Sequence, residues 1–128
     1  MKKCTPVMVV DAIEPCLAFW VERLGFAKTA EVPHGDRLGF VMLNRGGVEL
    51  MYQTRASIAA DDPTVGREPF RGHTPLFIEV DDLAAVQSAL AGAEVLIAER
   101  KTFYGATETA VRGPDGQVIT FAQFAKEG

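Results

Sequence analysis

The sequence predicts an α+β fold made of two tandem βαβββ modules, and three observations support this prediction. First, a buried-strand pattern followed by a helical pattern occurs twice along the 128 residues. Second, three further strand candidates, separated by turn residues, follow each helix. Third, local motifs recur, because Val10-Asp11 precedes the first helix as Val80-Asp81 precedes the second. Two similar halves in so short a chain indicate a duplication around one shared core.

The first module is expected to cover residues 1–54. Residues 5–10 are apolar enough for a buried strand, and a helix is expected from about residue 13 to residue 24. Asp11 is expected to cap this helix and Gly25 to end it. Its apolar stripe contains Ile13, Leu17, Trp20, Val21 and Leu24. Three strands are then expected, at residues 27–33, 38–43 and 48–53.

The polar residues 55–72 are expected to connect the modules and to carry one short helical turn near residues 57–60. The second module, residues 73–128, repeats the pattern with a strand at 74–80 and a helix that Asp81-Asp82 caps. Leu83, Val86 and Leu90 should point inward. The expected strands of this module are residues 94–98, 107–112 and 118–124, the last two joined by the turn Gly113-Pro114-Asp115-Gly116.

Composition limits the possible partners and the compartment. The net charge of −4 argues against a nucleic-acid partner, because such proteins need a basic face. The longest apolar run, Val7 to Val10, is too short to cross a membrane, and the acidic residues that follow it argue against a signal peptide. Cys4 and Cys16 fit neither a metal-binding spacing nor a disulfide framework. These features predict a cytoplasmic protein that contacts neither nucleic acid nor membrane.

Several motifs, in this order and spacing, resemble the vicinal-oxygen-chelate superfamily of glyoxalases, extradiol dioxygenases and bleomycin-resistance proteins. The resemblance covers essentially the whole chain and is strongest toward the bleomycin-resistance type. It implies paired βαβββ modules with curved mixed sheets, helices on the outside and a homodimer, strand-swapped or not, with pockets between subunits. The motifs are Leu17-Ala18-Phe19-Trp20, Glu22-Arg23-Leu24-Gly25-Phe26, Gly46-Gly47-Val48-Glu49-Leu50-Met51, Ile78-Glu79-Val80-Asp81-Asp82, Tyr104-Gly105 with Glu108, and Val111-Arg112-Gly113-Pro114-Asp115-Gly116.

Enzymes of this superfamily hold a divalent metal with four side chains, two from each module. The resemblance places these positions at Thr5, Glu49, Pro75 and Thr120. Only Glu49 is a strong ligand, since proline has no side-chain donor and a neutral threonine hydroxyl binds transition metals poorly. His73 lies two residues before Pro75. Together, His73 and Glu49 are weak candidates for a metal site, because they supply only two ligands. The sequence therefore predicts the superfamily scaffold without a metal cofactor.

Without a metal, the inward-facing side chains predict a pocket for a small organic molecule. Val48 and Leu50 suit the core face of their strand, so Glu49 and Met51 should face the pocket, where the carboxylate could bind a cationic group. The aromatic rings of Phe103 and Tyr104, shortly before the strand expected at residues 107–112, could close over the ligand. The remaining predicted ligand contacts are Phe40, Met42, Phe77, Phe103, Tyr104, Glu108 and Thr120.

The leading hypothesis is a metal-free homodimer that sequesters an antibiotic or a similar aromatic or cationic compound. One alternative is a metal-dependent lyase, isomerase or dioxygenase that uses His73 and Glu49. Another is metal-free catalysis with Glu49 or Glu108 as general base. A metal enzyme must hold near-stoichiometric metal and lose activity on chelation, whereas in a binding protein Glu49→Gln should weaken a cationic ligand.

Overall fold

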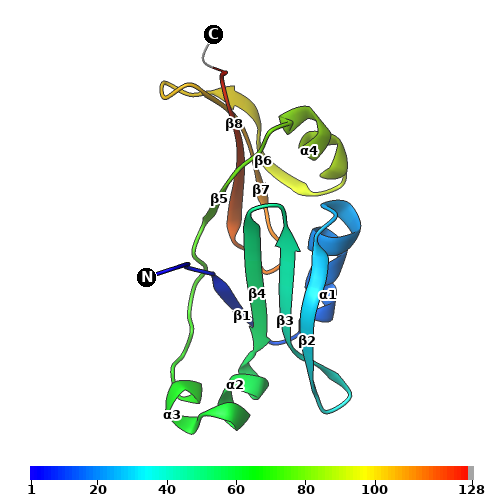
Figure 1. Ribbon diagram of the computed structural model, residues 1–128, viewed down its shortest axis with the longest axis vertical. Coiled ribbons are helices and arrows are strands. Elements are labelled where there is room, and N and C mark those ends of the chain that lie inside the picture. The colour runs from blue at the N-terminus through cyan, green and yellow to red at the C-terminus, as the bar shows by residue number, and fades with distance from the viewer. Residues whose placement is uncertain (127–128) are drawn as a thin grey trace. The chain divides into compact units, whose positions relative to one another are not determined.

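A computed structural model describes residues 1–126 and shows an α+β fold (Figure 1). The chain divides into two compact units, Met1–Gly72 and His73–Gly128. Each unit contains a four-stranded mixed sheet, with the strand orders β1-β4-β3-β2 and β5-β8-β7-β6. The two orders are equivalent, so the structure confirms the prediction of two tandem βαβββ modules.

The first sheet consists of β1 (Val7–Val10), β2 (Ala27–His34), β3 (Arg37–Arg45) and β4 (Val48–Thr54). β1 runs parallel to β4, whereas β2, β3 and β4 form an antiparallel ribbon. A parallel neighbour requires a crossover connection, and the helical segment after β1 provides it. Tight turns join the antiparallel strands where Gly35 and Gly46 adopt positive φ angles.

The crossover of the first unit is α1 (Glu14–Leu17), continued by the π-helical segment η1 (Ala18–Arg23). The predicted cap was wrong: Ile13 is the N-cap, and Asp11 instead pairs with Arg55 at 2.9 Å. The helix begins too far along the chain for Asp11 to reach its first N–H groups. Gly25, with a φ of 72°, follows the helix as predicted.

The core of the first unit lies between this helical segment and one face of the sheet. Val41, Leu43, Leu50 and Tyr52 alternate along β3 and β4 and are buried. Trp20, which is fully buried, donates a hydrogen bond from Nε1 to the Tyr52 hydroxyl at 2.8 Å. The helix and the sheet are therefore joined by a paired polar contact as well as by apolar packing.

Two helices follow the first sheet, where the sequence predicted a single turn. They are α2 (Arg55–Asp61) and α3 (Pro63–Gly66). Thr54 caps α2 by accepting a hydrogen bond from the Ser57 N–H, and Asp62 caps α3 by accepting one from the Thr64 N–H. The two caps explain why this polar segment forms helices without a long apolar stripe.

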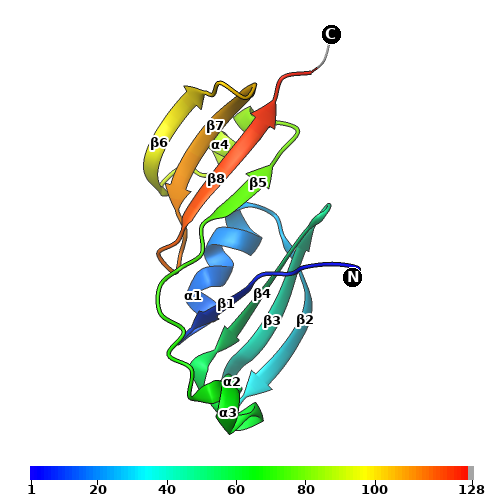
Figure 2. The ribbon, with the colours of Figure 1, turned by 90° about the vertical axis from the view of Figure 1, so that its left-hand side faces the viewer.

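The second unit contains β5 (Leu76–Glu79), α4 (Leu83–Ala89), β6 (Glu94–Lys101), β7 (Ala106–Arg112) and β8 (Val118–Phe124), as Figure 2 shows. Asp82 caps α4, and the three predicted inward residues of this helix are buried. β5 begins later than predicted, so His73 precedes the strand and does not share its faces. No helix within residues 1–126 has the length and apolar character needed to cross a membrane.

Candidate ligand-binding surface

One face of the second sheet is covered by α4, and the opposite face carries most of the predicted site residues of this unit. The Gln123 side chain accepts a hydrogen bond from the Leu83 N–H, which places it on the α4 side. Side chains alternate along a strand, so Thr120 and Phe124 point to the opposite face. Phe77 pairs with Thr120 across β5 and β8 and shares that face.

A charged network lies on this uncovered face. Glu108 is 2% exposed and receives hydrogen bonds from Arg100 Nε at 3.1 Å and Arg100 Nη2 at 3.0 Å, both to Oε1. Its Oε2 accepts a short hydrogen bond from the Tyr104 hydroxyl. We call these three residues the Glu108 network. A buried carboxylate requires such partners, because burying an unpaired charge is costly.

The ionisation of Tyr104 reflects this network. The hydrogen bond to Glu108 raises the pKa of the Tyr104 hydroxyl above its usual value, and burial and the negative charge of Glu108 act in the same direction. The same carboxylate raises the pKa of Arg100. Around neutral pH, Tyr104 therefore remains a neutral hydroxyl that donates a hydrogen bond to Glu108.

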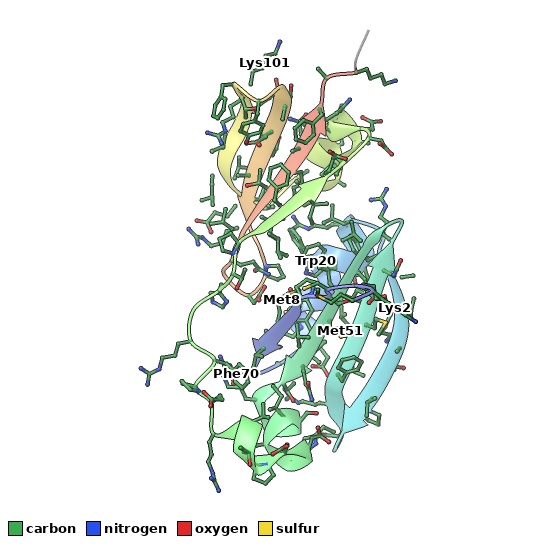
Figure 3. All side chains as sticks on the ribbon, turned by 60° about the vertical axis from the view of Figure 1, so that its left-hand side comes forward. Lys2, Met8, Trp20, Met51, Phe70 and Lys101 are labelled. Atoms are coloured by element: carbon green, nitrogen blue, oxygen red, sulfur yellow. The ribbon has the colours of Figure 1, made fainter. Side chains whose placement is uncertain are left out.

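Four aromatic side chains, one of which is Tyr104 of the Glu108 network, lie close together. The rings of Tyr104 and Phe124 are 6.2 Å apart, those of Phe77 and Phe124 are 6.4 Å apart, and those of Phe103 and Tyr104 form an edge-to-face pair at 5.1 Å. We call these four residues the aromatic cluster. All four are exposed; Phe103 is fully so and Phe77 is 55% exposed. Figure 3 labels Lys101, the last residue of β6, next to the turn that carries Phe103 and Tyr104.

Glu49 lies on the face of the first sheet opposite the helix, as its alternation with buried Leu50 predicted. Its Oε1 accepts a hydrogen bond from the Thr5 hydroxyl at 2.8 Å and pairs with Lys3 Nζ at 2.9 Å. The Lys3 contact, followed by that of Thr5, lowers the pKa of the Glu49 carboxyl. Glu49 thus already has a cationic partner from its own chain.

Three other predicted contacts share this face of the first sheet. Met42 pairs with Met51 across β3 and β4, and Phe40 precedes Met42 by two residues on β3. All three are half-buried, in contrast to the fully buried residues between them. Met51 is labelled on β4 in Figure 3. The predicted residues therefore form two groups, one on the uncovered face of each sheet.

The side chains at the four metal positions do not fit a superfamily metal site. Thr5 and Glu49 do lie together, but Lys3 neutralises the carboxylate. Pro75 offers no donor, and Thr120 offers only a neutral hydroxyl. His73 approaches a different carboxylate, that of Asp115, at 4.0 Å. Within residues 1–126, the structure contains no group of three or more His, Cys, Asp or Glu side chains that could hold a metal ion.

Sequence comparison supports the family resemblance. Residues 5–121 match the sequence model of the Glyoxalase/Bleomycin resistance protein/Dioxygenase superfamily. The match covers most of the chain, and the protein belongs to this superfamily. The comparison with curated proteins found no match.

Several solved structures share the fold at low sequence identity. TioX from Micromonospora sp. ML1 is 17% identical, with a TM-score of 0.75 over 98% of this chain and 100% of that one. A bleomycin resistance determinant encoded on the transposon Tn5 is 21% identical, with a TM-score of 0.68 over 98% and 100%. A lactoylglutathione lyase from Agrobacterium tumefaciens is 16% identical, with a TM-score of 0.72 over 96% and 94%. The fold thus occurs in proteins with different functions.

The sequence patterns did not predict three residues that belong to these surfaces. Phe124 could have been found, because it lies four residues after Thr120 on a strand that was predicted with the correct ends. Arg100 could not, since the predicted strand ended at residue 98. Lys3 lies before any predicted element, and only the sheet brings it to Glu49.

Proposed function

We propose that this protein binds a small aromatic compound without a metal ion and sequesters it. The observation that carries the proposal is the aromatic cluster on the uncovered face of the second sheet. Phe77 and Phe124 come from two neighbouring strands, and Phe103 and Tyr104 come from the β6–β7 turn. A planar ligand could stack on these rings, as aromatic groups commonly do in binding sites.

The Glu108 network gives this surface a fixed support. Arg100 and Tyr104 hold the Glu108 carboxylate, and in turn the carboxylate fixes the orientation of the Tyr104 ring. A ligand therefore meets a ring whose position is already determined, which reduces the entropy cost of binding. The same contacts favour binding over proton transfer, because Glu108 is buried and its oxygens are already engaged.

We propose further that the protein acts as a homodimer in the cytoplasm. The superfamily resemblance supports the dimer, as does the row of exposed apolar residues Val95, Leu96 and Ile97 on the edge strand β6. No disulfide joins Cys4 and Cys16 within residues 1–126, which suits a reducing compartment.

Calorimetric titration of EDTA-treated protein tests the proposed function. The ligands are bleomycin, because one structural neighbour is a bleomycin resistance determinant, and a panel of planar aromatic compounds. We expect at least one compound to bind without added metal. Phe77→Ala and Phe124→Ala should each weaken its binding about tenfold, as expected when a stacking ring is lost. Val32→Ala is the matched control, because Val32 is an equally exposed apolar residue on the first sheet.

Two outcomes would contradict this proposal. One is binding that the Phe77 and Phe124 variants leave unchanged. The other is stoichiometric retention of Zn²⁺, Ni²⁺, Mn²⁺ or Fe²⁺ with ligand binding that disappears on chelation. The second result would favour a metal-dependent lyase, isomerase or dioxygenase, the function class to which the lactoylglutathione lyase neighbour points.

A further inference from the structure

The first unit contains a pocket of about 340 Å³ beneath the connector between the modules. Its floor is the uncovered face of β1, with Val7 and Val9, and its wall comes from the connector, with Ile58, Val65 and Phe70. All of these residues lie within Met1–Gly72, and none belongs to the aromatic cluster. An inference about this pocket therefore goes beyond the proposed function.

The polar lining of the pocket is acidic. Its polar residues are Asp61 and Asp62, which are exposed, and Gln53, whose amide nitrogen donates a hydrogen bond to Ser57 Oγ at 3.3 Å. One oxygen of Asp62 accepts a hydrogen bond from the Thr64 N–H. Within residues 1–126, no ion pair joins either aspartate to a lysine, arginine or histidine. The pocket thus combines an apolar interior with two negative charges that lack a cationic partner in the described part of the chain.

Phe70 is held over this pocket in an unusual backbone conformation. Its φ of 42° lies in the left-handed region, and it is the one non-glycine residue with a positive φ among those the structure describes. Arg55 donates a hydrogen bond to the Phe70 carbonyl at 3.4 Å and also pairs with Asp11 at 2.9 Å. Residues in such conformations cluster at ligand-binding sites, where the surrounding structure stabilises them. Figure 3 shows Phe70 on the connector segment that follows α3.

We propose that this pocket binds a small organic cation with an apolar body. The apolar part contacts the valines, Ile58 and Phe70, and the ammonium group lies at the Asp61 and Asp62 carboxylates. The Phe70 ring in the lining suits such a ligand, because the face of an aromatic ring attracts a cation. Glu49 is less suited to this role, since Lys3 already neutralises it.

Methyl NMR titration of the full chain tests this proposal with two nearly isosteric ligands. The probes are 4-phenylbutylamine, which is a cation at neutral pH, and 4-phenyl-1-butanol, which is neutral. The amine should shift the methyl resonances of Ile58 and Val65 and bind at least about fivefold more tightly than the alcohol, as expected for a partly exposed ion pair. Equal affinity for the two ligands, or no saturable shift of these methyl groups, would overturn the proposal.

Matched variants identify the carboxylate that is responsible for the tighter binding of the amine. Asp61→Asn should weaken the amine about fivefold and leave the alcohol unchanged. Glu68→Gln removes the same charge from an exposed residue of the same segment that does not line the pocket, and it should change neither affinity. If Asp61→Asn does not fold, Asp62→Asn replaces it, because asparagine also caps helices. An unchanged preference for the amine in the folded variant would contradict the proposal.

The proposed function and this pocket can fail independently. Phe77→Ala should leave the amine-induced shifts of Ile58 intact, because the two surfaces share no residue. Amine-induced shifts confined to the second unit would overturn the pocket proposal and leave the aromatic cluster as a binding surface.

Discussion

At the scale of single residues, two glutamates on the uncovered sheet faces are paired within the chain. Glu49 has Lys3 and Thr5, and Glu108 has Arg100 and Tyr104. Such pairing allows a carboxylate to lie on a partly dehydrated surface without an external cation. The aspartates of the connector pocket differ, which is why the proposed cation site lies there.

Tyr104 gives this pairing a measurable pH dependence. Because its pKa is raised, the neutral Tyr104 hydroxyl stabilises the folded protein at pH values below the usual tyrosine pKa of about 10. This stabilisation is lost as the pH rises through the pKa that Tyr104 has in the folded state. Absorbance titration at 295 nm should show Tyr104 ionising above pH 10, and Glu108→Gln should lower this midpoint. The chain has two tyrosines, so Tyr104→Phe should remove half of the total change. A midpoint that Glu108→Gln leaves unchanged would argue against the Glu108 network.

At the scale of elements, α2 and α3 turn a polar linker into one wall of a pocket. The helices meet at Gly66, where a Cβ atom would lie 2.6 Å from Ala59 Cα. Real side chains do not tolerate so close an approach to backbone, so only glycine permits this packing. The geometry of the pocket therefore depends on a residue that does not line it.

Gly66→Ala should force α2 and α3 apart and destabilise the protein by about 1–3 kcal/mol, the usual cost of overpacking. Urea denaturation measures this loss. Gly47→Ala is the matched control, because nothing lies within 4 Å of a Cβ atom built at that position. The Gly66 variant should also reduce the affinity for 4-phenylbutylamine, since Val65 would move with α3. Equal stabilities of the two variants would show that the helices pack differently.

At the scale of the whole molecule, the two units repeat one topology but carry different surfaces. The first unit has the paired Glu49 and the acidic pocket, whereas the second has the aromatic cluster. Duplication of a fold leaves surface positions free to diverge, while the core keeps its alternation of buried residues. The function is therefore to be sought in these differences rather than in the shared topology.

Native mass spectrometry of the metal-replete protein tests the assembly and the metal content together. We expect twice the mass of one chain and no stoichiometric metal. Val95→Glu and Ile97→Glu, on the exposed edge strand β6, should shift the population toward the monomer if a second copy covers this edge. A dimer that holds about one metal ion per chain would instead require an enzyme function, and a monomer would contradict the proposed assembly.

Local sequence patterns determined much of the fold. Alternation and helical spacing identified every strand, and turn residues located the junctions between them, because these signals act between near neighbours in the chain. The Asp82 cap and the end of the first helix at Gly25 were predicted for the same reason. The second connector helix was missed, because two short capped helices have no apolar periodicity to reveal them.

Only the tertiary structure decided which side chains meet. Lys3 and Thr5 reach Glu49 across more than 40 positions of sequence, because β1 lies beside β4, and Phe124 joins Phe77 because β8 lies beside β5. Asp11 was predicted to cap a helix but pairs with Arg55, 44 residues away. The sequence by itself thus determined the strands, the two crossover helices and the superfamily. The pairing of charges and the pocket depend on sheet register and helix packing, which join residues too distant for any local pattern to specify.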